Sequence, residues 1–130
     1  MIKEVDIYSI GTDIVDTARI KNALTRSAKF KDRVFTAKEQ KYCEAKGKQR
    51  FESYAARYAA KEAVVKSIGT GFGKNASLTE VEVISSNQGP PGVKLHGKAR
   101  LYMESMDIKC ILLSMSAIRD YALAYAVSLI

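Results

Sequence analysis

The segment 54–68, YAARYAAKEAVVKSI, carries the charged side chains best placed to do chemistry. It is built mainly of alanine, valine and tyrosine, a composition that predicts a largely buried helix. At about 100° per residue, Arg57 and Lys61 share one face of this helix, while Glu62 and Lys66 share another face about 140° away. The four charges therefore cannot all lie on one solvated stripe.

Glu62 and Lys66 have two interpretations. As an exposed i,i+4 ion pair they would stabilise the helix by only about 0.3–0.5 kcal/mol. In the alternative, Glu62 supplies a carboxylate ligand to a hard cation, and Lys66 reaches a phosphate oxygen that the cation also touches. Magnesium favours this second arrangement, because it takes one or two protein carboxylates and completes its octahedron with water and substrate phosphates.

Asp13 is the candidate for a second carboxylate ligand. The preceding residues 5–10 alternate imperfectly and run into Gly11, which predicts a strand ending in a tight turn, with Asp13 at its exit. A side chain in that position is presented at the edge of a sheet. The alternative is an ordinary aspartate in a turn or at a helix N-cap, where this residue type is favoured.

A glycine-rich stretch, Gly69-Thr70-Gly71-Phe72-Gly73-Lys74, follows the predicted helix. It is not a Walker A sequence, because the Gly-Lys-Ser/Thr ending is missing and the helix precedes the loop instead of following it. Glycines nevertheless let backbone amides approach a diphosphate closely, and Lys66 and Lys74 add positive charge nearby. A helix C-cap followed by a flexible turn accounts for the same glycines.

The size and charge of the chain narrow the class of protein. Its 130 residues suit one domain spanning 1–130. The net charge of +7 is concentrated in residues 1–75, which hold 16 Lys and Arg against 9 Asp and Glu, and this distribution favours a polyanionic partner. No apolar run approaches the roughly 18 residues of a membrane span, and the first ten residues lack the apolar segment of a secretory signal, so we expect a cytoplasmic protein.

Cysteine and histidine are too few for several kinds of site. Cys43, Cys110 and His96 are the only residues of these types, which excludes a zinc site, a disulfide framework and catalysis by a Ser-His-Asp or Cys-His set. Any metal here must be held by oxygen.

The remaining pattern predicts an α+β fold, with strands at both ends of the chain and helices between them. The predicted helices are a short basic helix from Asp16 that exposes Arg19 and Arg26, a second over 36–46 with a capping box, the long helix 51–68, and a fourth over 97–106. The predicted strands are 5–10, 81–84, 93–95, and a C-terminal hairpin of 111–116 and 121–129.

Three segments, in their order and spacing, together resemble the holo-acyl-carrier-protein synthases of the 4′-phosphopantetheinyl transferase family. They are Ile10-Gly11-Thr12-Asp13-Ile14-Val15-Asp16 with Arg19-Ile20, then Arg33-Val34-Phe35-Thr36 with Glu39, then Arg57-Tyr58-Ala59-Ala60-Lys61-Glu62-Ala63 with Lys66 and Gly69-Thr70-Gly71. The similarity extends over nearly the whole chain, including the closing strand pair around Ser114 to Tyr125.

The resemblance implies the family's fold, a mainly antiparallel sheet packed against a long central helix and shorter helices. It implies transfer of the 4′-phosphopantetheine group of coenzyme A to a serine of apo-acyl-carrier protein, with release of adenosine 3′,5′-bisphosphate, in fatty-acid biosynthesis and lipid metabolism. It also implies a homotrimer with active sites between subunits.

The same resemblance implies roles for the residues of the long helix and of Asp13. Asp13 and Glu62 bind Mg²⁺, which bridges to the diphosphate of coenzyme A, and Lys66 stabilises charge on the phosphate under attack. Arg57, Lys61 and the backbone of Gly69-Thr70-Gly71 match positions near the nucleotide part of coenzyme A. The base that takes the serine proton is left open between Asp13 and a metal-bound water.

The resemblance also bears on carrier-protein binding and on nucleotide binding. Arg19 and Arg26 match basic positions that meet the acidic recognition helix of the carrier protein. Many relatives carry a histidine in the C-terminal hairpin, in a Ser-x-Ser/Thr-His pattern, where this chain has Ser114-Met115-Ser116-Ala117. In this chain, other residues must supply what that histidine contributes to nucleotide binding in the relatives.

Two rival functions remain open from the residues alone. A small basic nucleic-acid-binding module would explain the charge, but the basic residues are not interleaved with aromatics in a stacking platform, so we expect no nucleic-acid partner. A catalytically silent homologue that only binds carrier protein is the second rival.

Overall fold

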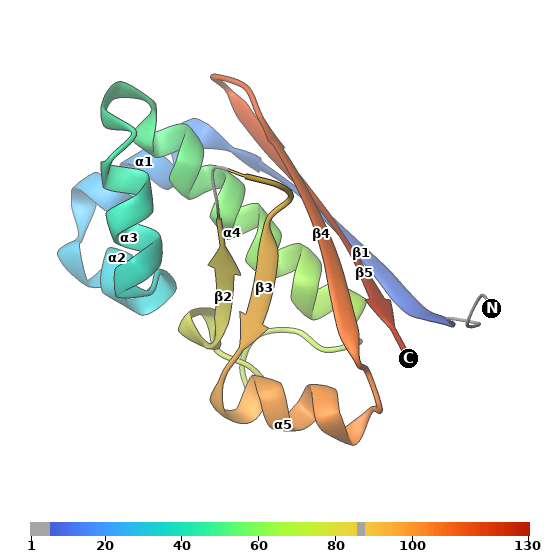
Figure 1. Ribbon diagram of the computed structural model, residues 1–130. Helices are drawn as coiled ribbons and strands as arrows, with labels where there is room; N and C mark the ends of the chain where they lie inside the picture. Colours follow the sequence, from blue (N-terminus) through green and yellow to red (C-terminus); the bar gives the residue numbers. More distant parts are fainter. Residues whose placement is uncertain (1–5, 86–87) are drawn as a thin grey trace.

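The computed structural model describes residues 6–85 and 88–130, which form an α+β fold (Figure 1). In chain order the elements are β1 (Ile7–Asp16), α1 (Thr17–Arg26), α2 (Ala28–Val34), α3 (Ala37–Glu44), η1 (Gly47–Gln49), α4 (Arg50–Ser67), η2 (Leu78–Glu80), β2 (Val81–Ile84), β3 (Gly92–Leu95), α5 (Gly97–Ser105), β4 (Cys110–Ala117) and β5 (Tyr121–Leu129). The predicted fold class is confirmed. None of the helices in these two ranges is both long and apolar enough to cross a membrane.

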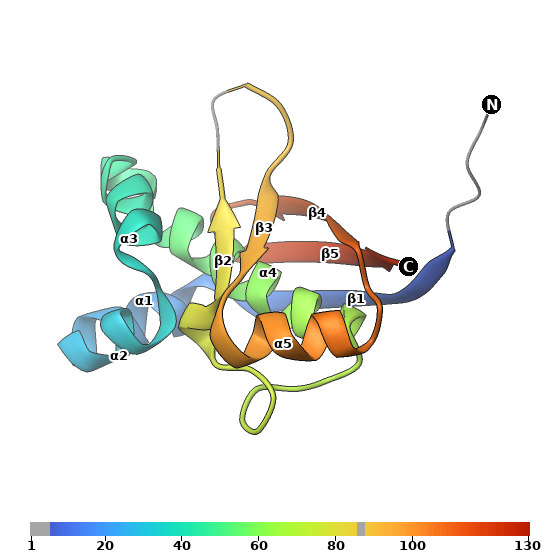
Figure 2. The same cartoon turned by 60° about the horizontal axis from the view of Figure 1, so that its bottom comes forward.

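The strands form two antiparallel sheets on the central helix α4. One sheet has the order β1-β5-β4 and the other pairs β2 with β3. Helix α4 lies between them, while α1, α2 and α3 gather at one end and α5 runs beneath the smaller sheet (Figures 1 and 2). The long buried helix expected from the sequence is therefore the centre of the fold.

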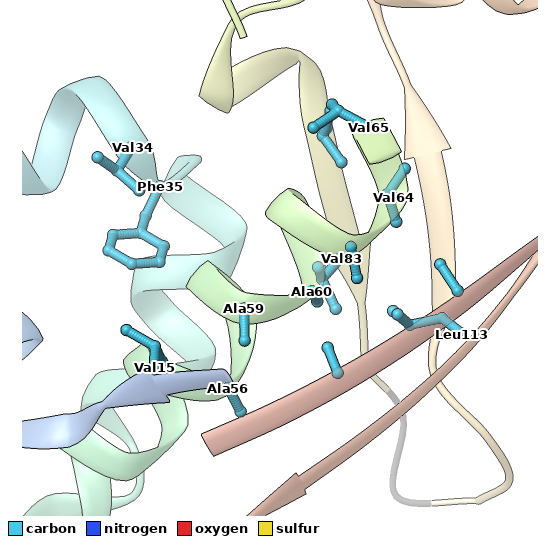
Figure 3. Close-up of a cluster of buried hydrophobic side chains, with 14 of the residues drawn as sticks. Val15, Val34, Phe35, Ala56, Ala59, Ala60, Val64, Val65, Val83 and Leu113 are labelled. Atoms are coloured by element: carbon cyan, nitrogen blue, oxygen red, sulfur yellow. The ribbon is translucent and has the colours of Figure 1, made fainter. Parts of the chain in front are cut away.

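Small side chains let α4 approach the larger sheet closely. Strand β5 buries every second residue, and three of these are alanines, Ala122, Ala124 and Ala126. Helix α4 meets them with a face that is also rich in buried alanine; Figure 3 shows Ala56, Ala59 and Ala60 in this core. Because alanine loses no side-chain rotamer freedom on burial, this close packing adds no such entropy cost.

Gly11 marks the closest approach of strand and helix. A Cβ atom placed on Gly11 would lie 2.0 Å from the backbone oxygen of Ala63 and 2.8 Å from the backbone nitrogen of Ser67. The glycine thus removes a side chain where α4 crosses β1, and the strand continues through it, with Gly11 opposite Ala126 of β5. The expected tight turn at Gly11 is absent from the described chain.

Asp13 also lies elsewhere than predicted, because β1 continues through Gly11. It lies inside β1, paired with Ala124 of β5, and not at a strand exit, because pairing with β5 extends β1 to Asp16. Since side chains alternate along a strand, Asp13 shares the inner face of β1 with Gly11 and Val15. That face is directed toward α4.

Side-chain caps mark the first residues of α1 and α3. Asp16 caps α1, its carboxylate accepting from the backbone N–H of Ala18 at 2.9 Å. Thr36 and Glu39 form the expected capping box of α3. Helix α2 was not predicted, because a segment of seven residues offers too little periodicity to distinguish it from a loop.

We predict that Gly11→Ala destabilises the protein by about 1–3 kcal/mol, because the added methyl group must displace the backbone of α4. The free energy of unfolding in urea measures the effect. Gly71→Ala is the matched control, since a Cβ there meets nothing within 4 Å. Equal stability of the two variants would contradict the proposed contact.

Candidate functional site

Strand β1 and helix α4 bring Asp13, Glu62 and Lys66 together on one side of the molecule. The ammonium Nζ of Lys66 lies 3.4 Å from Asp13 Oδ1 and donates a hydrogen bond to the carbonyl oxygen of Thr12 at 3.0 Å. Glu62 lies one helical turn before Lys66 and is half-buried. The side chain of Lys66 is 51% exposed, so it is free to turn toward a ligand.

The two carboxylates lie close enough to repel each other. The pKa of Glu62 is raised, first by burial and then by the negative charge of Asp13, while the cations Lys66 and Arg19 oppose the rise. The pKa of Tyr58 is also raised, by burial and by the charges of Glu62 and Asp13. A cation placed between the carboxylates would offset this repulsion.

The donor set suits a hard cation. Among the described residues, no three histidine, cysteine, aspartate or glutamate side chains gather into one cluster that could hold a metal on their own. Two carboxylates with open positions beside them are instead what Mg²⁺ uses when water and substrate phosphates complete its octahedron. The residues present therefore fit a magnesium ion bound together with a phosphorylated substrate.

The glycine-rich loop begins directly after the site. The backbone N–H of Gly69 donates to the carbonyl oxygen of Lys66 at 3.1 Å, and Gly69 has a positive φ of 84°. Gly69 and Gly71 are exposed and Thr70 is half-buried. The loop backbone is thus within reach of a ligand that also contacts Lys66.

Arg57 lines a separate cavity of about 330 Å³ on the other side of α4. Its guanidinium lies 4.2 Å from the centroid of the Tyr42 ring and donates to the carbonyl of Ser53 at 3.2 Å and to the hydroxyl of Ser85. The Nε atom is buried without a hydrogen-bond partner in the described structure. The other residues that line the cavity are Lys46, Gln49, Glu52, Ala56, Gly89, Pro91, Met115, Ser116 and Ala117.

Lys61 is not among the residues that the structure brings to either site. It is fully buried, and its Nζ donates to Glu39 Oε1 at 2.8 Å and to the carbonyl oxygens of Leu78 at 3.0 Å and Val81 at 2.5 Å. All three N–H donors of the ammonium are used, so Lys61 cannot contact a nucleotide in this conformation. Burial lowers its pKa, and the charge of Glu39 opposes that change.

Glu39 is a partner that the sequence reasoning missed. Its two carboxylate oxygens also accept from the backbone N–H groups of Thr36 and Val83, each at 2.8 Å. The capping box predicts the bond to Thr36, and Glu39 also stands in one of the three segments of the resemblance, but neither signal predicts the bonds to β2 and α4. This buried charge network connects α3, α4 and β2.

Arg19 and Arg26 are exposed on α1. Arg26, together with Arg33, borders a groove of about 450 Å³ whose apolar floor contains Phe30 and Val34. Arg19 is close enough to Glu62 to act on its pKa, so α1 extends from the carboxylate pair to this groove.

Comparison with known proteins relates most of the chain to one family. The family model of the 4′-phosphopantetheinyl transferase superfamily matches residues 9–126. The chain is similar to the holo-[acyl-carrier-protein] synthase of Clostridium tetani, with 50% identity over 125 residues that cover 93% of this chain and 94% of that protein.

Two solved structures share the fold. The holo-[acyl-carrier-protein] synthase from Neisseria meningitidis is 31% identical, with a TM-score of 0.85 over 95% of this chain and 98% of that one. The enzyme from Helicobacter pylori, solved in complex with coenzyme A, is 30% identical, with a TM-score of 0.79 over 92% of this chain and 98% of that one.

We predict that Lys61→Met destabilises the protein by about 3–5 kcal/mol, because it leaves the carboxylate of Glu39 buried without its cation. Adding Glu39→Gln should restore part of the loss, since the unpaired charge is then removed. Chemical denaturation of the single and double variants measures both effects. An unchanged stability, with a loss of coenzyme A affinity alone, would instead make Lys61 a ligand contact.

Proposed function

The chain belongs to the 4′-phosphopantetheinyl transferase superfamily, and we propose that the cluster of Asp13, Glu62 and Lys66 is where it transfers 4′-phosphopantetheine from coenzyme A to a serine of apo-acyl-carrier protein. The second product is adenosine 3′,5′-bisphosphate. The observation that carries the assignment is the convergence of two carboxylates, from β1 and α4, beside a half-exposed lysine. The family model's match to residues 9–126 supports treating residues 1–130 as one transferase domain.

Asp13 and Glu62 are the proposed ligands of one Mg²⁺ ion. When bound, the ion would neutralise negative charge on the phosphate oxygens of coenzyme A. Both side chains come from rigid elements of the core, so the two carboxylates would be held in place for the ion before it binds. Burial, and after it the negative charge of Asp13, raises the pKa of Glu62, and a bound dication would offset both effects.

Lys66 is the proposed stabiliser of charge that builds on the phosphate under attack. Its ammonium now bonds the Thr12 carbonyl and Asp13, and its exposed side chain can exchange these bonds for a phosphate oxygen. Such transfer depends mainly on in-line positioning of the serine and on charge neutralisation. Asp13 and a water bound to the metal are the two candidates for the base that accepts the serine proton.

The cavity around Arg57 is the proposed site of the nucleotide part of coenzyme A. Its buried guanidinium has an unpartnered Nε donor, and Lys46 adds a second positive charge, which together suit a phosphate. Ala117 lines this cavity, so in this chain the hairpin contributes a methyl group there. The resemblance places Gly69, Thr70 and Gly71 near the nucleotide, but here their loop begins beside Lys66, so we propose that its backbone contacts the diphosphate instead. The N–H groups of Gly69 and Thr70 donate to the carbonyls of Lys66 and Val65, so the proposed donor of the three is Gly71.

A homotrimer with sites shared between subunits would reconcile these two positions. Arg57 and Glu62 are about 140° apart around α4, so they face different sides of one subunit. In the proposed trimer, coenzyme A held at the Glu62 of one subunit would place its nucleotide at the Arg57 of a neighbour. The outer face of the larger sheet supports such an assembly, because it exposes Ile10, Ile14, Leu112, Leu123 and Tyr125. Sedimentation velocity of the purified chain tests this proposal.

The basic helix α1 is the proposed docking surface for the acidic helix of the carrier protein. Arg19 lies beside the carboxylate pair, and Arg26 borders an apolar groove, so a partner with acidic and apolar side chains would be held next to the reacting phosphate. The proposed location is the cytoplasm, whose reducing conditions suit the free thiols of Cys43 and Cys110. Fatty-acid biosynthesis is the proposed pathway.

We predict that the wild-type chain, incubated with coenzyme A, Mg²⁺ and an apo-carrier protein, adds one phosphopantetheine to the carrier. Glu62→Gln should lower the rate by at least about 100-fold, because it removes one charged ligand of the metal. Intact mass spectrometry of the carrier measures both. Glu104→Gln, on the exposed Arg100–Glu104 pair, is the control. A wild-type chain that binds carrier without modifying it would be a silent scaffold, and full activity of Glu62→Gln would refute the metal assignment.

We predict that Arg26→Glu raises the KM for carrier protein about tenfold at low salt, because it places a negative charge against an acidic partner. The KM for coenzyme A should not change. Lys109→Glu, which makes the same change of charge at an exposed position, is the control. Equal effects of the two substitutions would show that net charge, and not α1, attracts the carrier.

A further inference from the structure

Helix α5 lies against the glycine-rich loop that follows α4, although its residues belong to none of the sites described above. Figure 2 shows the chain after α4 running alongside this helix. Lys98 donates from its Nζ to the carbonyl oxygen of Gly73 at 2.8 Å. The hydroxyl of Tyr102, one turn further along α5, lies 3.5 Å from the carbonyl oxygen of Gly69. One face of α5 therefore lies against the loop at both ends of the loop, near Gly69 and near Gly73.

Helix α5 is itself fixed to the rest of the fold. The carboxylate of Glu80, in η2, accepts from the backbone N–H of Lys98 at 2.8 Å and from that of Ser77 at 2.9 Å. Gly97 makes this possible, because a Cβ atom there would lie 2.1 Å from Glu80 Oε2. The two side chains that reach the loop thus extend from an anchored support.

The backbone hydrogen bonds of the loop itself lie at its two ends. Gly69, Gly71 and Gly73 have no side chains to pack, and Gly69 and Gly73 have positive φ values of 84° and 131°. The N–H groups of Gly69 and Thr70 donate to the carbonyls of Lys66 at 3.1 Å and Val65 at 3.0 Å, and Gly73 N–H donates to the carbonyl of Ala76 at 2.8 Å. The Asn75 amide donates to the hydroxyl of Thr70 at 3.3 Å, and the ring of Phe72 packs against the core. Among the described residues, the N–H groups of Gly71 and Phe72 have no such acceptor. Fixing such a backbone at the moment of binding would cost conformational entropy for each residue, so contacts that order it beforehand raise affinity.

We propose that Lys98 and Tyr102 are positioning residues, which hold the loop 69–73 so that the backbone N–H groups of Gly71 and Phe72 are ready for the diphosphate of coenzyme A. The proposal rests on the proposed function of that loop. It assigns Lys98 an indirect role, because its ammonium is directed to the carbonyl of Gly73. Tyr102 carries no charge, so any effect of its hydroxyl on a polyanionic ligand comes through the loop.

The affinity for coenzyme A, measured by calorimetry with Mg²⁺ and without carrier protein, tests the proposal. Lys98→Met removes the ammonium, and Tyr102→Phe removes only the hydroxyl. Arg100→Met is the matched control, because it removes one positive charge from the exposed Arg100–Glu104 pair of the same helix. Lys98→Met should weaken binding about 3- to 10-fold, the effect of losing one hydrogen bond. Tyr102→Phe should weaken binding less, because its hydroxyl lies 3.5 Å from the Gly69 oxygen, and the control should not weaken it.

Hydrogen exchange of the amides of residues 69–76, in the absence of ligand, is the second measurement. Both positioning variants should speed it, and kcat at saturating coenzyme A and the KM for carrier should stay near wild-type values. Unchanged binding by both variants overturns the proposal while the wild-type transfer activity stands. The proposal is also overturned if only Lys98→Met weakens coenzyme A binding and this effect disappears at high salt. Lys98 would then attract coenzyme A directly by its charge. A wild-type chain that binds no coenzyme A refutes the proposed function itself.

Discussion

The close contact between Gly11 of β1 and the backbone of Ala63 in α4 is the constraint on which the rest of the site depends. It sets how near the helix lies to the sheet, and Asp13 is on the same face of the strand, two residues further on. Glu62 precedes Ala63 directly. One missing side chain therefore fixes the separation between two carboxylates that are far apart in the sequence, and rigid elements hold both of them.

Periodicity and composition predicted the framework of the fold well. The long helix, the capping box at Thr36 and the C-terminal hairpin each depend on local signals, and all three are confirmed. The extent of β1 could not be predicted in this way. Gly11 is ambiguous in a sequence, since a glycine permits both a tight turn and a close approach of two backbones, and only the pairing with β5 distinguishes them.

The candidate site was predictable where residues on one helix share a face, and less so where a side chain has a distant partner. Helical geometry separated Arg57 and Lys61 from Glu62 and Lys66, as the structure does. It could not show that Lys61 is paired with Glu39, because the two come together only when α3 packs on α4 and β2. A lysine in a helix motif can thus belong to the interior while its neighbour faces a ligand.

The bonds made by Glu39 and Lys61 also affect whether a strand of another chain can add to the smaller sheet. Among the strands of residues 6–85 and 88–130, β2 has a neighbour on one side only, and the unpaired edge of a sheet is a template onto which a foreign strand can add. Glu39 and Lys61 occupy the N–H of Val83 and the carbonyl of Val81, two groups that such an intruder would need. The buried ion pair thereby protects the smaller sheet against aggregation.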